Sequence, residues 1–141
     1  RQELIAADSN ICRNYKLLTS IKGVGPITAI VMLCSTLNFT KITDHRKFAC
    51  YCGLAPFEHS SGTSVRGGCH TSSMANRDIK VQLNRSALIA IRCDPQLKAY
   101  YERKVAEGKH KFSVLNAVRA KIAARCFAVV RRGTPYVALQ I

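Results

Sequence analysis

Apolar residues recur every three to four positions along most of this chain, the spacing that lines one face of an α-helix. The predicted helices cover residues 1–20, Pro26 to about Leu37, a short segment from Asp44 through Cys52, 77–92, Pro95 to about Glu107, and 111–132. We find no internal repeat, low-complexity tract or linker. The expected fold class is therefore mainly α.

Residues that favour helix ends mark several of these boundaries. Pro26 suits the first position of a helix, because a backbone N–H there would have no partner within the helix. Asp44 and Asn76 are predicted to cap the helices that follow them. Asp94 with the proline after it begins the next helix, and Gly108 ends it.

Basic side chains accompany the apolar stripes of two predicted helices. The predicted helix over 77–92 has its apolar stripe at Ile79, Leu83, Ala87, Ala90 and Ile91, with Arg77, Arg85 and Arg92 on the other side. The predicted helix over 111–132 has its apolar stripe at Leu115, Val118, Ile122, Cys126 and Val129, with Lys121, Arg125 and Arg132 along one edge. Each helix thus pairs a core-facing stripe with a row of cations.

Residues 53–75 interrupt the helical pattern and are rich in Gly and Ser. A compact domain seldom keeps a loop longer than ~12–15 residues without a functional reason. We expect an irregular segment here, or one that contains a small β element.

The charge of the chain points to a polyanionic partner. Its 141 residues include 22 Lys and Arg against 8 Asp and Glu, a formal net charge of +14. Such an excess favours nucleic acid, then an anionic membrane surface, while a basic protein that is merely soluble is the remaining alternative. No apolar run reaches the ~18 residues of a membrane-spanning helix. Without Trp or a bulky aromatic face, a membrane-surface protein is also a poor alternative.

The cysteines and acidic residues offer little support for a metal site. Seven scattered cysteines without a secretory signal favour reduced thiols and a cytoplasmic location. Cys50 and Cys52, with Cys69 and His70, are conceivable zinc ligands, but their Cys-x-Cys spacing is tighter than zinc sites use. Buried thiols are the favoured alternative. The carboxylates are too scattered to predict a two-metal cluster, so we expect no metal in this chain.

The segment around Gly23-Val24-Gly25 resembles a helix-hairpin-helix motif. Its glycines allow a tight turn and a close approach to a phosphate. Backbone N–H groups at the start of the next helix, near Thr28, favour an anion, and Lys22 adds a cation. We therefore expect these residues to contact the DNA backbone. An ordinary helical hairpin is the alternative.

A second candidate lies between His59 and Gly68. A serine on a flexible loop can expose its hydroxyl, and Arg66 can neutralise a phosphate. A serine needs a base or a polarised phosphate to become a nucleophile. From the residues alone, a simple Ser/Gly-rich turn remains the main alternative.

Four segments, taken in order, resemble a known family. These segments are Ile21-Lys22-Gly23-Val24-Gly25-Pro26-Ile27-Thr28-Ala29, Phe48-Ala49-Cys50-Tyr51-Cys52-Gly53-Leu54-Ala55-Pro56, Ser61-Gly62, and Gly133-Thr134-Pro135-Tyr136. Together with a helix from Asn76, they are similar to the C-terminal domain of the IS-one-ten/IS-eleven-eleven class of insertion-sequence transposases, relatives of the Piv-type DNA invertases. The resemblance covers about residues 15–136.

The resemblance implies a C-terminal transposase domain over 16–141, preceded by the end of a connecting coiled-coil-like helix over 1–15. It implies a serine nucleophile that becomes linked to DNA, aligned with Ser61, with Ser60 and Ser64 as near alternatives. Mg²⁺ is expected in an N-terminal RuvC-like domain outside this chain, so we expect this fragment alone to be inactive and to bind no cofactor. The implied partners are DNA, a guide RNA in guided members, and further copies of a bacterial, nucleoid-associated protein. The competing hypothesis is a non-catalytic helix-hairpin-helix DNA-binding module.

Overall fold

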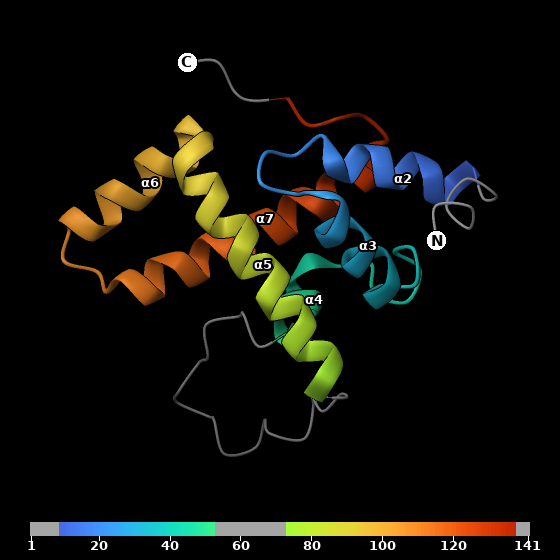
Figure 1. Ribbon diagram of the computed structural model, residues 1–141, viewed down its shortest axis with the longest axis horizontal. Coiled ribbons are helices and arrows are strands. Elements are labelled where there is room, and N and C mark those ends of the chain that lie inside the picture. Colours follow the sequence, from blue (N-terminus) through green and yellow to red (C-terminus); the bar gives the residue numbers. More distant parts are fainter. Residues whose placement is uncertain (1–8, 53–72, 138–141) are drawn as a thin grey trace.

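The computed structural model describes residues 9–52 and 73–137, with the backbone alone for 73–76. Its helices are α2 (Ser9–Thr19), α3 (Pro26–Ser35), α4 (His45–Cys52), α5 (Ser73–Cys93), α6 (Pro95–Ala106) and α7 (Lys111–Arg132), drawn in Figure 1. These two stretches contain no strand, so the prediction of a mainly α fold is confirmed. The Gly/Ser-rich segment lies outside the described residues as far as residue 72. No helix in the described ranges is long and apolar enough to cross a membrane.

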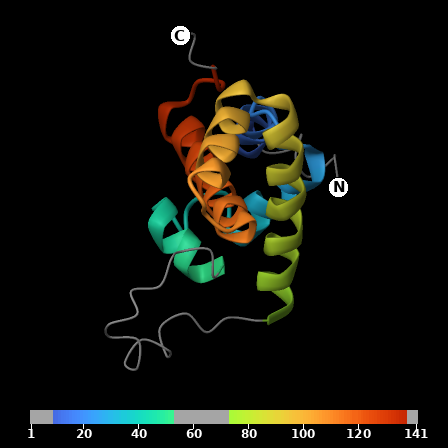
Figure 2. The same ribbon diagram turned by 90° about the vertical axis from the view of Figure 1, so that its left-hand side faces the viewer.

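Helix α5 occupies the centre of the arrangement. It packs against α3, α4, α6 and α7, and it crosses the middle of the molecule in Figure 1. Helices α6 and α7 pack against each other as a hairpin, while α2 contacts α3 and α7. In the side view of Figure 2, α7 passes between α4 and α5. Every helix therefore shares the same core.

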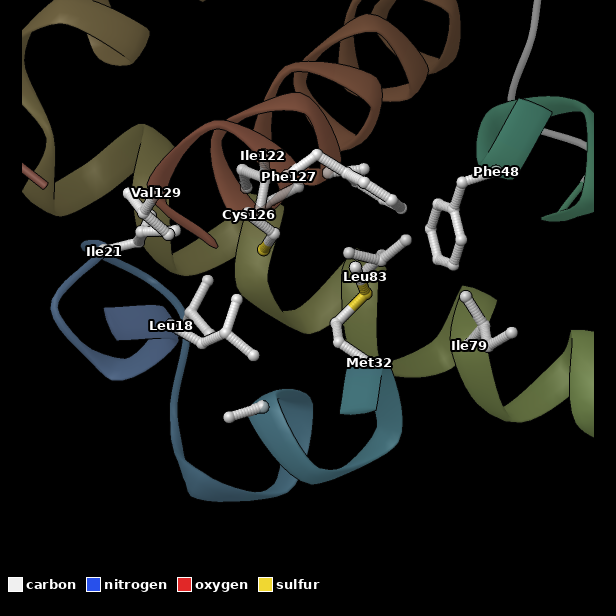
Figure 3. Close-up of a cluster of buried hydrophobic side chains, with 14 of the residues drawn as sticks. Leu18, Ile21, Met32, Phe48, Ile79, Leu83, Ile122, Cys126, Phe127 and Val129 are labelled. Carbon is white, nitrogen blue, oxygen red and sulfur yellow. The ribbon is translucent and has the colours of Figure 1, made fainter. Parts of the chain in front are cut away.

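Side chains of α2, α3, α4, α5 and α7 point toward one another in the core (Figure 3), and Leu97 of α6 belongs to the same core. Its largest fully buried members include Leu18, Met32, Phe48, Leu83 and Ile122. Eight of the ten residues in the predicted stripes of α5 and α7 belong to this buried core, and the other two, Ile91 and Leu115, are partly buried against it. Both sequence-predicted apolar faces are thus confirmed.

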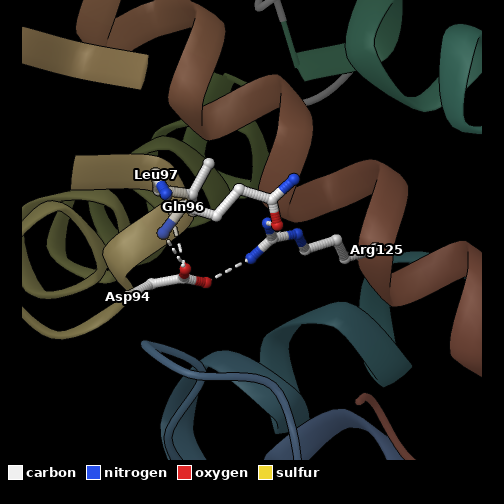
Figure 4. Close-up of polar contacts among 4 residues, drawn as sticks. All are labelled: Asp94, Gln96, Leu97 and Arg125. Carbon is white, nitrogen blue, oxygen red and sulfur yellow. Dashed lines mark hydrogen bonds and ion pairs between the residues drawn. The ribbon is translucent and has the colours of Figure 1, made fainter. Parts of the chain in front are cut away.

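The boundaries of α6 and α7 agree with the predicted ranges. The Asp94 Oδ1 accepts hydrogen bonds from the N–H groups of Gln96 at 3.0 Å and Leu97 at 3.4 Å, as drawn in Figure 4. The His110 Nδ1 accepts a hydrogen bond from the Phe112 N–H at 3.1 Å at the start of α7. Gly133 ends α7 in the left-handed conformation, with φ of 74°. Both helices therefore have the side-chain and backbone caps that free helix ends require.

Two predicted boundaries are wrong. Helix α5 begins at Ser73, so Asn76 lies within it and is not its cap. The residues of that extra turn include Met and Ala, which propagate a helix well. Helix α3 stops at Ser35 and not at Leu37, because the next residues leave the helical conformation.

The end of α3 depends on Thr36 and three residues with positive φ. The buried Thr36 hydroxyl donates a hydrogen bond to the Met32 carbonyl and accepts one from the Phe39 N–H. Leu37, Asn38 and Phe39 have φ of 49°, 57° and 62°. This turn brings the Phe39 ring to 4.9 Å from that of Phe127 on α7, between centroids. The strained backbone is thus coupled to an aromatic contact in the core.

Candidate nucleic-acid interface

The turn between α2 and α3 is fixed by two buried side chains. Ile21 is 2% exposed and Val24 is 5% exposed, and both belong to the core. The Val24 N–H donates to the Ile21 carbonyl at 3.0 Å, which closes the turn. Lys22 lies between these anchors and is exposed. The core therefore holds the turn so that a single cation projects from it.

Gly23 lies where this turn meets α5. Its φ is +94°, and a Cβ at this position would lie 2.7 Å from the Ser86 carbonyl oxygen and 3.2 Å from the Ala90 Cβ. Glycine is therefore required here both by the backbone conformation and by the close contact with α5. The glycine at position 23, which predicted a tight turn, is thus explained by packing of the turn against α5.

The beginning of α3 presents an open backbone. Gly25 occupies the N-cap position and supplies no side-chain cap, and Pro26 follows at the first helical position. A Cβ on Gly25 would meet nothing within 4 Å, so this position is open. Ile27, next along, is 59% exposed. The helix start thus has the open backbone that binding of an anion needs.

Thr28 faces the opposite way. Its side chain is buried, and its Oγ1 lies 3.1 Å from the Ser86 Oγ in a hydrogen bond between α3 and α5. The hydroxyl therefore contributes to the packing of these two helices, and only the backbone of Thr28 remains for an external contact.

The predicted basic row of α5 faces outward. Arg77, Arg85 and Arg92 are all exposed, on the side of the helix away from its buried stripe. Ser86, which contacts the α2–α3 turn, directly follows Arg85. The fold thus brings the turn that carries Lys22 close to the middle of the α5 arginine row.

The two predicted cations of α7 have different surroundings. Lys121 is exposed, with its Nζ 4.6 Å from the centre of the Tyr100 ring on α6. Arg125 donates to the Asp94 Oδ2 at 2.6 Å and to the Gln96 Oε1 at 3.1 Å (Figure 4). Its guanidinium also lies over the Tyr136 ring. Arg125 therefore joins α7 to α6, while Lys121 lies on the surface.

The catalytic candidates fall outside the described part of the chain. Ser61, its alternatives Ser60 and Ser64, and Arg66 all lie between residues 53 and 72. They remain predictions. Cys69 and His70, the distant half of the conceivable zinc set, lie there as well.

The remaining two conceivable zinc ligands, Cys50 and Cys52, differ in exposure. Cys50 is exposed and Cys52 is buried on α4. Burial raises the pKa of the Cys52 thiol to about 12, with a partial opposing effect from the nearby Lys80 charge. Within residues 9–52 and 73–137, His, Cys, Asp and Glu form no group of three or more that could hold a metal ion.

A cluster of aromatic and basic residues on α6 and α7 was not predicted. The Arg103 and Lys104 side chains lie over the Tyr100 ring, which also contacts Lys121. Further toward the end of the hairpin, the His110 and Phe112 rings stack. The alternation of Lys with His and Phe over 109–112 is the signal that would have indicated this region, since interleaved cations and aromatic rings are typical of nucleic-acid surfaces.

The described residues thus define a basic helical domain with an exposed cationic face. The sequence profile described as the Transposase IS116/IS110/IS902 family matches residues 15–102, and the chain belongs to this family. The resemblance inferred from the four ordered segments is therefore confirmed.

Individual relatives agree with this assignment. The insertion element IS110 uncharacterized 43.6 kDa protein of Streptomyces coelicolor is 39% identical over 121 residues, which cover 85% of this chain and 29% of the relative. The pilin gene-inverting protein of Moraxella bovis is 24% identical over 95% of this chain and 42% of its own length. The insertion element IS900 uncharacterized 42 kDa protein of Mycobacterium paratuberculosis is 30% identical over 78% of this chain and 28% of its own length. The chain thus spans less than half the length of each of these relatives.

Proposed function

We propose that this chain is the DNA-binding C-terminal domain of an insertion-sequence transposase. The observation that carries the proposal is the family match over residues 15–102, in a chain with a formal net charge of +14. A relative named for inverting a pilin gene supports the same class, since inversion acts on DNA. The excess of cations supplies the electrostatic attraction on which binding to the phosphate backbone depends.

The proposed contact surface combines the α2–α3 turn with exposed cations of α5 and α7. Lys22 and the open start of α3 after Gly25 face one phosphate, and Arg77, Arg85 and Lys121 supply further charges. Such contacts position a duplex without reading its sequence. Gly23 and Val24 hold the turn in place, while Thr28 and Arg125 support the surface through contacts with α5 and α6.

Salt-dependent binding of the 141-residue chain to a short labelled duplex tests this surface. Each phosphate neutralised contributes about −0.9 to the slope of log affinity against log salt. We expect Lys22→Gln and Arg85→Gln each to make the slope shallower by roughly one contact and to weaken binding. The matched control is Lys47→Gln, which removes another exposed cation, on α4 and outside the proposed surface. Equal losses from all three variants would show that only net charge matters, and salt-insensitive binding would contradict the proposal entirely.

For the chemistry, we propose that Ser61 supplies the nucleophile for strand exchange in a composite site with a RuvC-like domain. In this proposal that other domain holds Mg²⁺, an element-encoded RNA guides the complex, and more than one protomer takes part. The support is the resemblance of the Ser61-Gly62 segment to the family serine.

The test of Ser61 uses the longer transposase that contains this domain. Ser61→Ala is expected to abolish the covalent protein–DNA adduct while duplex binding persists, and Ser60→Ala and Ser64→Ala are the matched controls. An adduct that survives in Ser61→Ala would exclude this residue. If strand exchange also survives in all three variants, the domain is a non-catalytic binding module, for which Gly23→Ala is expected to abolish binding.

A further inference from the structure

We propose that the end of the α6–α7 hairpin is a second DNA site, which binds an unpaired base of a single strand. The connection between the two helices lies at the opposite end of the molecule from α2 in Figure 1. An open pocket of about 670 Å³ is formed there by the last turns of α6, the connection and the first turns of α7. This volume is in the range of ligand-binding pockets, roughly 300–1,000 Å³.

The pocket presents an aromatic surface that is held in place but not buried. Phe112 is 72% exposed, and its ring stacks on that of His110 with centroids 5.4 Å apart and an interplanar angle of 21°. The hydrogen bond from the Phe112 N–H to the His110 Nδ1 fixes the local backbone. Tyr101, Val105 and Leu115 line the pocket beside these rings and are partly buried. A nucleobase is a ligand that binds to such a surface by stacking on the exposed aromatic rings.

The charges around the pocket suit a strand of phosphates. Lys109 and Lys111 line it and are exposed, and no acidic residue is among the lining side chains. Glu107 is close in sequence, but its carboxylate lies 3.5 Å from the Lys104 Nζ. A base on the aromatic surface would therefore have cations near the phosphates on either side of it.

The stacking geometry favours an unpaired base over a duplex. A base inside a duplex is stacked on both faces by its neighbours and has no free face for Phe112, whereas an unpaired base does. The assignment of the strand as DNA rests on the proposed function, because strand exchange opens DNA duplexes. The existence of a base-stacking site rests on the pocket itself.

Fluorescence anisotropy with a labelled oligo-dT strand and with a duplex of equal length tests this site. Stacking of one base contributes about 1–3 kcal/mol by alanine substitution, so Phe112→Ala is expected to weaken single-strand binding by roughly 5- to 150-fold. Duplex binding is expected to change less than about twofold, because the proposed duplex contacts are elsewhere. Phe112→Trp should retain single-strand affinity. Val137→Ala, which shortens another highly exposed apolar side chain, is the matched control.

Three outcomes would overturn the inference. Phe112 has no specific role in single-strand binding if Phe112→Ala leaves the affinity for oligo-dT unchanged. The same conclusion follows if Phe112→Ala weakens binding of the single strand and of the duplex equally. A loss confined to an RNA strand of the corresponding sequence would show that the site serves RNA. The two sites are independent if Lys22→Gln weakens duplex binding while Phe112→Ala still weakens single-strand binding to the same extent. Failure of the proposed duplex surface can therefore be distinguished from failure of the proposed base-stacking site. Thermal unfolding followed by circular dichroism confirms that each variant is folded.

Discussion

Gly23 shows how one residue connects the α2–α3 turn to the core. Replacement by Ala forces a side chain into a left-handed backbone, which costs roughly 1–2 kcal/mol, and places a Cβ 2.7 Å from a backbone oxygen of α5. Because that oxygen belongs to a helix and cannot swing away, we expect a loss of about 2–4 kcal/mol in the free energy of unfolding. Urea denaturation measures this loss.

Gly108 is the matched control for that substitution. It has nearly the same φ, +96°, but a Cβ there would meet nothing within 4 Å. Gly108→Ala is therefore expected to cost only the backbone component, roughly 1–2 kcal/mol, and less than Gly23→Ala. Similar losses in the two variants would mean that the contact of Gly23 with α5 contributes nothing.

Two buried thiols make stability depend on alkaline pH. Cys52 and Cys126 are fully buried, and burial raises the pKa of each to about 12 from an ordinary 9.0. Between these values the unfolded chain has lost the thiol protons and the folded chain retains them. The folded state binds more protons, so the free energy of unfolding is expected to fall as the pH rises from about 9 toward about 12.

Denaturation by urea at several alkaline pH values checks this prediction. Lysine and tyrosine residues titrate in the same range, so the comparison is between slopes. Cys52→Ala and Cys126→Ala are expected to flatten the pH dependence, whatever constant loss each causes through its cavity. Slopes in both variants that equal the slope of the unmodified chain would contradict the prediction.

At the scale of elements, local signals predicted some features well. Pro95 with its capping Asp94, and Gly108 after the end of α6, act through contacts within one turn, so a sequence pattern contains the necessary information. The apolar stripes of α5 and α7 could be predicted equally well, because helical periodicity determines which side chains share a face.

Features that depend on distant partners could not be predicted. The left-handed turn after α3 is coupled to a contact between Phe39 and Phe127, which are far apart in the chain. In the candidate site, Lys22 and the turn were predicted, but the burial of Thr28 depends on Ser86 and the engagement of Arg125 depends on Asp94. Only the packed helices reveal which polar side chains face the interior.

The Asp94 carboxylate joins α6 to α7. It caps α6 and forms an ion pair with Arg125 of α7, whose side chain is 15% exposed. Asp94→Ala removes the cap and leaves a poorly solvated cation, so we expect a loss of about 3–5 kcal/mol. Asp94→Asn retains a capping oxygen and should lose less, about 1.5–3 kcal/mol.

The ion pair of Lys104 with Glu107 provides the comparison for Asp94. Both of its side chains are substantially exposed, so Glu107→Gln is expected to change the free energy of unfolding by under about 1 kcal/mol. Chemical denaturation of Asp94→Ala, Asp94→Asn and Glu107→Gln measures the free energy of unfolding of each variant. A loss in Asp94→Ala no larger than that in Glu107→Gln would show that α6 and α7 are held together without this carboxylate.

At the scale of the whole molecule, the same charge that underlies the proposed DNA binding opposes folding. A net charge of +14 on 141 residues repels itself more strongly in the folded state than in the expanded chain. Salt shortens the range of this repulsion, from about 30 Å at 0.01 M to about 8 Å at 0.15 M ionic strength. We therefore expect the free energy of unfolding to rise when NaCl is raised over this interval.

A variant with fewer cations tests whether net charge is the cause. Lys41→Gln, Lys47→Gln and Lys98→Gln together change three exposed lysines and lower the formal net charge from +14 to +11, so the gain in stability from salt should shrink. The same three positions changed to Arg keep the charge and should keep the full gain. If salt instead lowers the stability of the unmodified chain, attractive pairs such as Asp94 with Arg125 outweigh the repulsion. In the expected case, a bound duplex stabilises the domain both by mass action and by neutralising the repulsion, so its stabilising effect should be largest at low salt.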